Sequence, residues 1–173
     1  MIRKATEKDV SAVAQIYDDI HTAEEKGLLT TGWLRNIYPV RETARKAVMN
    51  DELFVLEEDG MIFASARINR HQEPEYAHVE WKYDAEANEV LVMHTLVVSP
   101  AASGKGYGKT FAAYYEDMAR EMGMKVLRID TNARNIRARK LYAGLGFREA
   151  GIVPTTFNGI AGVDLVCLEK PVK

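Results

Sequence analysis

The sequence predicts a single α/β domain in which strands and helices are mixed along the chain. The chain has 173 residues, of which 47% are hydrophobic and 28% are charged. This length and composition are typical of one ordinary globular domain. Short apolar runs with strand character alternate with longer stretches of helical periodicity. We therefore expect one domain over residues 1–173, without a second core.

The first third of the chain predicts one strand and three helical pieces. A Thr6 and Asp9 pair is typical of the capping box that opens a helix. The expected elements are a strand at 2–5, a helix from this capping box to about Ile20, and helical pieces at 33–38 and 41–49 on either side of Pro39.

Two turn signals divide the rest of the chain. Asp59-Gly60 is the sharpest hairpin signal, and Gly123 is typical of a residue that ends a helix. The expected strands are 53–57, 61–68, 89–98, 126–130, 147–153 and 162–169, and the expected helices are 109–122 and 135–146. The last two strands can pair as a hairpin across a longer loop.

Cysteine content and hydropathy predict a cytoplasmic protein. Cys167 is the single cysteine, so no internal disulfide can form. No N-terminal apolar run or membrane-spanning stretch is present. Because Cys167 falls within a strand run, we expect it to act as a small buried hydrophobe and not as a nucleophile.

A glycine-rich loop is the first strong functional signal. It follows an apolar strand, precedes an amphipathic helix and reads Ser103, Gly104, Lys105, Gly106, Tyr107, Gly108, Lys109. Glycine adopts dihedral angles closed to other residues, which lets a backbone approach a ligand closely. The free N–H groups that open the next helix, aided by the helix dipole, point at an anion. The loop therefore predicts a phosphate-bearing ligand.

Two kinds of phosphate loop fit this segment. SGKGYGKT differs from the nucleotide-binding P-loop pattern G-x-x-x-x-G-K-[ST] only at Ser103. A P-loop domain would place the loop after an early strand and use a later Asp, such as Asp130, to hold Mg²⁺. Here the loop lies past mid-chain, and a patterned helix with a tyrosine follows Asp130. The P-loop is therefore the minority interpretation.

The helix after Asp130 carries a second motif. It reads N-x-x-A-x-x-L-Y-x-x-x-G-F, with Asn135, Ala138, Leu141, Tyr142, Gly146 and Phe147 at the specified positions. Together with the loop, this order of motifs over residues 96–147 resembles the acetyl-CoA core of the GNAT superfamily of N-acetyltransferases. The resemblance implies a central mixed, mostly antiparallel sheet of about six to seven strands flanked by about four helices. It also implies acetyl transfer from acetyl-CoA to a primary amine, with the cofactor core at about residues 90–147.

The resemblance assigns the cofactor side of the site position by position. The strand end formed by Leu96, Val97 and Val98 would pair with the pantetheine arm as an added strand does. The loop from Ser103 to Lys109 would hold the pyrophosphate, although the family usually has Gln or Arg where this chain has Ser103. Asn135 would contact the CoA arm, and it also suits the N-cap of its own helix. No metal is implied.

The implied reaction needs a base, an oxyanion donor and an acid. An alkylammonium has a pKa near 10.4, so a base or a water chain must remove a proton before the amine attacks. A backbone N–H near the splayed strand can stabilise charge on the thioester carbonyl. Tyr142 matches the family tyrosine that is proposed to protonate the leaving thiolate. Its alternative role is to pack one face of its helix.

The base is less well defined. His94 lies nine residues before Ser103, close to where some family members place a catalytic His or Glu, and its intrinsic pKa suits the task. A strand histidine with an ordinary structural role fits equally well. Glu80 is the second candidate, because a carboxylate between two strands could reach the amine. Glu57 is the third, although its acidic stretch is more typical of solvated surface.

Charge is unevenly distributed, although the net charge is only −2. Residues 71–89 hold six acids against one Lys, and residues 125–148 hold seven bases against Asp130. The basic residues could attract the CoA phosphates, and the acidic residues could attract a cationic amine. For the acidic stretch, an ordinary solvated surface is the simpler interpretation. Four aromatic residues could line an acceptor pocket or fill core: Trp33, Tyr38, Trp81 and Tyr83.

Other functions remain as alternatives. The RNIRARK run at 134–140 suggests nucleic-acid binding, but such domains have a pI above about 9, whereas this chain has a pI near 6.1. An acyl-CoA-binding module without catalysis is motivated by Ser103 and by the unassigned base. Homodimerisation through sheet edges or the C-terminal hairpin is compatible with the sequence. Segments 21–45 and 69–89 carry no recognisable signature of a particular acceptor amine.

Overall fold

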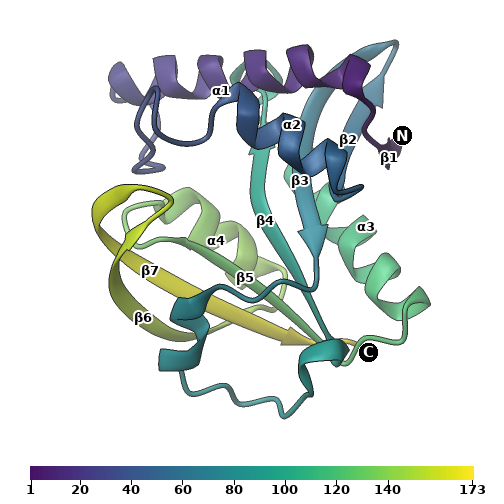
Figure 1. The fold of residues 1–173 in the computed structure, drawn as a ribbon, viewed down its shortest axis with the longest axis vertical. Coiled ribbons are helices and arrows are strands. Elements are labelled where there is room, and N and C mark those ends of the chain that lie inside the picture. The colour runs from purple at the N-terminus through teal and green to yellow at the C-terminus, as the bar shows by residue number, and fades with distance from the viewer.

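A seven-stranded sheet organises the chain, and the computed structural model describes all residues 1–173 (Figure 1). Its strands are β1 (Ile2–Lys4), β2 (Leu53–Glu58), β3 (Met61–Asn69), β4 (Val90–Val98), β5 (Val126–Asn132), β6 (Arg148–Phe157) and β7 (Ile160–Pro171). The spatial order is β1-β2-β3-β4-β5-β7-β6, and only the β4–β5 pair is parallel. The predicted mixed, mostly antiparallel sheet is confirmed.

Four α-helices cover the two faces of this sheet (Figure 1). They are α1 (Val10–Glu25), α2 (Arg41–Met49), α3 (Tyr107–Glu121) and α4 (Ile136–Gly144). Alternate residues of β2 show the division, since Val55 packs in the cluster with α1 and α2, whereas Phe54 packs in the cluster with α3 and α4. No helix is both long and apolar enough to cross a membrane.

Two hairpin turns combine Asn or Asp with Gly. Asp59-Gly60 joins β2 to β3 with φ values of 51° and 77°, as the sequence predicts. Asn158-Gly159 joins β6 to β7 with φ values of 50° and 78°, in place of the expected longer loop. The expected strands at 147–153 and 162–169 are therefore too short. Strand β6 continues to Phe157, although Pro154 and the polar residues after it interrupt the apolar pattern that predicts a strand. This second turn was readable in the sequence as an Asn-Gly hairpin signal.

Two helix predictions were also wrong. The segment 33–38 is not helical and forms only a bridge between Leu34 and Tyr38, because Gly32 has a φ of 77° and Pro39 restricts Tyr38. Helix α1 runs to Glu25 instead of Ile20, and the chain turns at Gly27, which has a φ of 72°. These changes matter because the irregular segment 31–38 borders the cavity described below.

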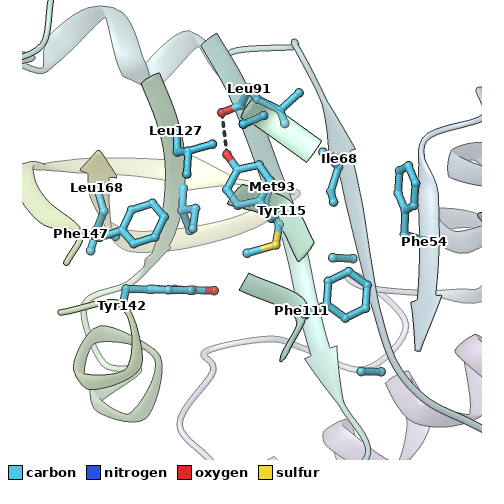
Figure 2. Packing of buried hydrophobic residues seen from close by; sticks show 14 of the residues in the cluster. Phe54, Ile68, Leu91, Met93, Phe111, Tyr115, Leu127, Tyr142, Phe147 and Leu168 are labelled. Atoms are coloured by element: carbon cyan, nitrogen blue, oxygen red, sulfur yellow. Dashed lines mark hydrogen bonds between the residues drawn. The ribbon is translucent and has the colours of Figure 1, made fainter. Parts of the chain in front are cut away.

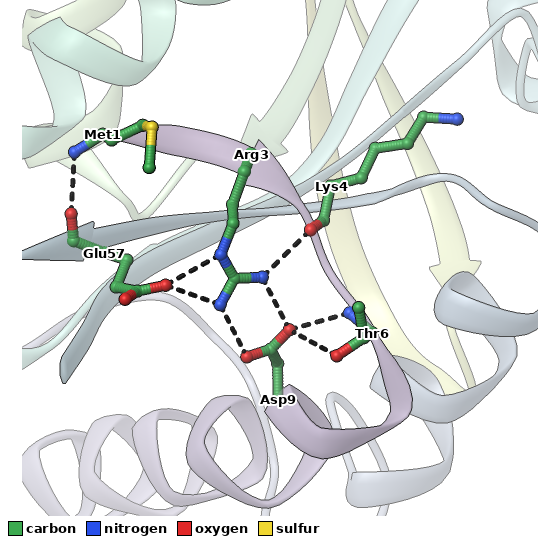
Figure 3. A network of polar contacts seen from close by, with 6 residues as sticks. All are labelled: Met1, Arg3, Lys4, Thr6, Asp9 and Glu57. Carbon is green, nitrogen blue, oxygen red and sulfur yellow. Dashed lines mark hydrogen bonds and ion pairs between the residues drawn. The ribbon is translucent and has the colours of Figure 1, made fainter. Parts of the chain in front are cut away.

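A polar network fixes the start of α1 against the edge of the sheet (Figure 3). Arg3 donates to both carboxylate oxygens of Asp9 at 2.8 and 2.9 Å, and its Nε donates to Glu57 at 2.7 Å. Asp9 also accepts from the backbone N–H of Thr6 at 2.7 Å, which completes the predicted capping box. The hydrogen bond from Arg3 is the main reason that the pKa of Asp9 falls to about 2.

Asp9→Asn is expected to lower the free energy of unfolding by about 2 kcal/mol at pH 7. Because the pKa of Asp9 is depressed in the folded protein, this stability is present above the unfolded value near 4. It is lost as the pH falls from about 4 towards about 2. Urea unfolding of both proteins between pH 7 and pH 3 checks this. Asp51→Asn is the control, because the Asp51–Lys4 pair is exposed and should contribute at most about 0.5 kcal/mol. An Asp9 effect independent of pH would contradict the assignment.

Candidate active site

The two parallel strands at the centre of the sheet separate part-way along their length. Pairing between β4 and β5 runs from Val90 with Val126 to Met93 with Ile129 and then ends. From His94 onward, β4 has no partner on the β5 side. An open backbone edge of this kind can pair with an extended ligand as an added strand would.

A bulge in β4 lies at the point of separation. Ser65 pairs with Val97 and Arg67 pairs with His94, so β4 carries one residue more than β3 over this stretch. Thr95 absorbs the extra residue with a φ of 51°, a genuine outlier for a β-branched side chain. Its hydroxyl is held by a hydrogen bond with the Tyr38 hydroxyl. Strained backbone held in place by its surroundings is a frequent feature of functional sites.

One cavity of about 500 Å³ runs through this gap and links the two faces of the sheet. At one end it is lined by the glycine-rich loop and the start of α4. At the other end it is lined by segment 31–38, the segment before η2 (Pro74–His78) and the β6–β7 hairpin. The predicted cofactor residues that line it are Leu96, Val97, Val98, Ser103, Gly104, Gly106, Tyr107, Gly108, Lys109 and Asn135. Lys105 is absent from the lining and lies over the Phe63 and Tyr107 rings.

The loop has the geometry of an anion site. Gly104 and Gly106 have φ values of 86° and 82°, and an added Cβ at either would meet no atom within 4 Å. Helix α3 begins at Tyr107, two residues earlier than predicted. The first intrahelical hydrogen bond joins Thr110 N–H to Gly106 O at 3.0 Å. The preceding N–H groups therefore have no acceptor within the helix and face an open space.

Two side chains of α4 and its cap adjoin this loop. Arg137 donates to the Ser103 hydroxyl at 2.6 Å, so a guanidinium from α4 reaches the position where the loop itself has only a short side chain. Asn135 caps α4 by accepting from Ala138 N–H at 3.1 Å, and it also lines the cavity. Arg139, one of the basic residues expected near the phosphates, is instead paired with Glu149.

Tyr142 lies on the α3 and α4 face of the sheet and lines the cavity. Its ring packs edge-on against Phe147, and its hydroxyl points towards the β4 side of the gap (Figure 2). No protein atom forms a hydrogen bond with this hydroxyl, and the hydroxyl oxygen remains accessible to solvent. Burial raises the pKa of Tyr142, so its hydroxyl keeps its proton at neutral pH. Both predicted roles, packing and facing the reacting atoms, are compatible with this position.

His94 lines the cavity on the opposite face of the sheet. Its Nε2 donates to Asn69 Oδ1 at 2.9 Å, because that oxygen also accepts from the His71 N–H and is therefore fixed as the carbonyl oxygen. Burial, with smaller contributions from Arg67 and His71, lowers the pKa of His94 to about 3. A neutral imidazole of such low basicity does not match the expectation of a base with an ordinary pKa.

Neither predicted carboxylate base reaches the cavity. Glu80 is exposed on the surface and is absent from the cavity lining. Glu57 is bound to Arg3 at the β1 edge of the sheet. The carboxylate of the acidic segment that does line the cavity is Glu73, whose Oε1 lies 3.4 Å from His94 Nδ1. Burial raises the pKa of Glu73 above its ordinary value.

Asp130 is the second carboxylate in the cavity, whereas the sequence pattern assigns it a function only in the P-loop interpretation, as a ligand of Mg²⁺. It is the first residue of β5 beyond the last pair with β4. Its Oδ2 accepts from the Tyr76 hydroxyl at 2.7 Å. The signal in the sequence is its position at the end of the apolar strand that follows the loop strand and its helix, because this order is typical of a parallel pair with a site at the carboxyl ends of the strands. Of the four predicted aromatics, Trp33 and Tyr38 line this cavity and Trp81 and Tyr83 do not.

Comparison with known proteins identifies the family. A model described as the acetyltransferase (GNAT) family matches residues 12–147. The chain belongs to the GNAT family of acetyltransferases. This GNAT membership rules out the P-loop interpretation of the glycine-rich loop. The predicted order of loop, strand and Asn-Tyr helix was therefore a valid family signature.

Solved structures share this fold along nearly their whole length. A GNAT acetyltransferase from Streptococcus agalactiae 2603 has a TM-score of 0.81 and 22% identity, covering 100% of this chain and 95% of that chain. An N-acetyltransferase from Staphylococcus aureus Mu50 has a TM-score of 0.73 and 22% identity, covering 100% and 98%. The protein yncA from Salmonella typhimurium, solved with its cofactor acetyl-CoA, has a TM-score of 0.69 and 20% identity, covering 100% and 94%.

A curated relative matches a shorter segment. YycN, an uncharacterised N-acetyltransferase of Bacillus subtilis strain 168, is 44% identical over 50 residues, which are 29% of this chain. The match covers 32% of the length of that relative. The similarity to the solved structures therefore describes the fold alone.

Proposed function

We propose that this GNAT protein transfers an acetyl group from acetyl-CoA to a primary amine bound in the cavity. The observation that carries the proposal is the continuity of one cavity from the anion loop, past the open edge of β4, to the Tyr142 hydroxyl. Each part corresponds to one requirement of the reaction: phosphate binding, alignment of an extended arm and protonation of a thiolate.

The cofactor residues fit this donor. The unpaired N–H groups at the start of α3 and the Arg137 guanidinium would hold the pyrophosphate. The free edge of β4 beyond Met93 would pair with the pantetheine arm, and its backbone N–H groups would polarise the carbonyl. The thioester supplies an activated acetyl carbonyl, so no covalent enzyme intermediate is required.

The acceptor end of the cavity suits a cationic amine. Glu73 and Asp130 line it together with Trp33, Tyr38 and Phe157. Carboxylates favour an ammonium group, and aromatic faces add cation–π attraction. A small amine or a peptide end would fit this chemistry.

An acceptor screen tests the proposed function directly. Purified protein is mixed with acetyl-CoA and a panel of polyamines, amino acids, peptides and aminoglycosides, and release of free thiol is measured. Thiol release that depends on one class of amine supports the proposal. If acetyl-CoA stabilises the protein against heat but no amine releases thiol, the chain is an acyl-CoA-binding module without catalysis.

Gly106→Ala is expected to raise the Kd for acetyl-CoA about tenfold or more, because alanine at this φ shifts the N–H groups that bind the phosphates. It should also destabilise the protein by about 1 kcal/mol. Calorimetric titration with acetyl-CoA and urea unfolding give the two values.

Gly123→Ala is the matched control for this variant. Gly123 also has a positive φ, 69°, an added Cβ there also meets nothing within 4 Å, and the residue follows the far end of the same helix. It should lose similar stability and keep its affinity for acetyl-CoA. Equal loss of affinity in both variants would show that the effect arises from destabilisation and not from the loop.

A further inference from the structure

The register of the central sheet places two reactive positions side by side. Met93 and Ile129 form the last pair between β4 and β5, so His94 and Asp130 are the first residues on either side of the gap. Side chains alternate between the faces of a sheet. Both therefore share the face of Val92 and Val126, which pack with Tyr76 in the cluster beneath segment 70–89.

Tyr142 approaches the same gap from the opposite face. It belongs to the cluster formed with Met93 and Ile129, whose side chains point away from the Asp130 face. The cavity lining includes residues of both faces, so the gap connects Asp130 with the Tyr142 hydroxyl. An amine that enters from the Asp130 face and a thiolate that leaves towards Tyr142 would lie on opposite sides of the reacting carbonyl.

Asp130 lines this cavity and has a free acceptor atom. Its Oδ2 accepts a hydrogen bond from the Tyr76 hydroxyl, whereas its Oδ1 has no hydrogen-bond partner in the protein and remains accessible to solvent. Glu73 is less suitable, because it belongs to an irregular segment and lies beside His94 and His71. His94 donates through Nε2 to Asn69 and is nearly non-basic.

We propose that Asp130 is the catalytic residue that binds the acceptor ammonium and accepts its proton. This inference rests on the proposed acetyl transfer. One proton passes from the ammonium to Asp130 Oδ1, and the neutral nitrogen then forms a bond to the carbonyl carbon. The C–S bond breaks and the sulfur takes the Tyr142 hydroxyl proton. The nitrogen loses its second proton to solvent, Tyr142 regains a proton from solvent, and Asp130 releases its proton to solvent before the next turnover.

The surroundings of Asp130 adjust its acidity in opposite directions. Burial is the main cause that raises the pKa of Asp130 to about 7, the Tyr76 hydrogen bond lowers it, and the charges of Glu73 and Glu75 raise it. A base with a pKa near the working pH is the most efficient proton acceptor. The titratable and charged groups around it are Glu73, Glu75 and Tyr76 before and within η2, Cys167 on β7, Tyr142 on α4, Tyr38 before α2, His94 on β4 and Arg67 on β3.

The first test is the pH dependence of kcat/KM with an amine found in the acceptor screen. Wild type should show activity that rises through about pH 7 as Asp130 loses its proton. Asp130→Asn should lose that rise and about 100-fold or more in kcat/KM, with an unchanged Kd for acetyl-CoA. An intact rise near pH 7 in this variant would overturn the proposal.

Two neighbouring substitutions should move the rise in opposite directions. Tyr76→Phe removes the donor that favours the charged carboxylate, so the rise should move to higher pH. Glu73→Gln removes a repelling charge, so it should move to lower pH. A merely structural effect would lower the rate without these opposite shifts, and unmoved profiles in both variants would refute the assignment.

Carbon-13 NMR of the Asp130 carboxyl in protein without ligands gives a readout independent of turnover. The resonance should titrate near pH 7 and shift in the same directions in Tyr76→Phe and Glu73→Gln. A titration near pH 4 would overturn the proposal even if the enzyme is active. If wild type releases no thiol with any amine, both the proposed function and the role of Asp130 fail. If wild type turns over while Asp130→Asn keeps its pH profile, only the role of Asp130 fails.

Discussion

Replacing Tyr142 with phenylalanine is expected to lower kcat about 100-fold while leaving the Kd for acetyl-CoA unchanged. The hydroxyl faces the cavity, has no hydrogen-bond partner in the protein, and keeps its proton because burial raises its pKa. Phenylalanine preserves the packing against Phe147 and removes only the proton that the leaving thiolate would take. Single-turnover thiol release measures the chemical step, and calorimetry measures cofactor affinity.

Tyr114→Phe is the matched control. Tyr114 lies on the neighbouring helix α3, packs edge-on near Phe111, and does not line the cavity. Its variant should turn over at the wild-type rate. An unchanged single-turnover rate for Tyr142→Phe would assign Tyr142 to packing alone, the alternative role that its helical neighbours indicate.

The local structure of the proposed donor half could be predicted because its parts are close in the sequence. The loop, the strand end and the Asn135 helix lie within residues 96–147, and each is a local structure with a known residue preference. Glycines at 104 and 106 do adopt positive φ angles, and Asn135 does cap α4. Contacts of this kind depend on neighbouring residues, which sequence patterns describe well.

The proposed acceptor half could not be predicted, because it depends on register and burial. Glu73 and Glu80 lie in the same acidic segment, and only the fold of that segment turns Glu73 into the cavity and leaves Glu80 on the surface. Asp130 becomes significant only because β4 and β5 separate immediately before it. The low basicity of His94 likewise results from its burial near Arg67, from a different strand.

Glu169 contributes to the stability of the fold and also anchors the segment that lines the proposed acceptor half of the site. It lies on β7, is fully buried, and accepts from the backbone N–H groups of Lys82 and Tyr83 at 2.8 and 3.3 Å. Arg148 donates to the same carboxylate at 2.5 Å. Glu169 therefore ties the far end of segment 70–89, which carries Glu73 and Tyr76, to the rigid sheet.

Glu169→Ala is expected to lower the free energy of unfolding by about 3 kcal/mol, because it leaves two backbone donors without partners and removes the buried end of an ion pair. Glu149→Ala on the neighbouring strand is the control. It breaks an Arg–Glu pair that is partly exposed, with no buried carboxylate, and should cost less than about 1 kcal/mol. Urea unfolding at pH 7 compares the two variants.

The same Glu169→Ala variant should also separate the two halves of the site. Loosening segment 70–89 displaces Glu73 and Tyr76, so the KM for the amine should rise several-fold. The glycine-rich loop does not contact Glu169, so the Kd for acetyl-CoA should stay at the wild-type value. Equal loss of donor and acceptor binding would instead mean that the whole domain loosens, and Glu169 would then support the fold without a specific link to acceptor binding.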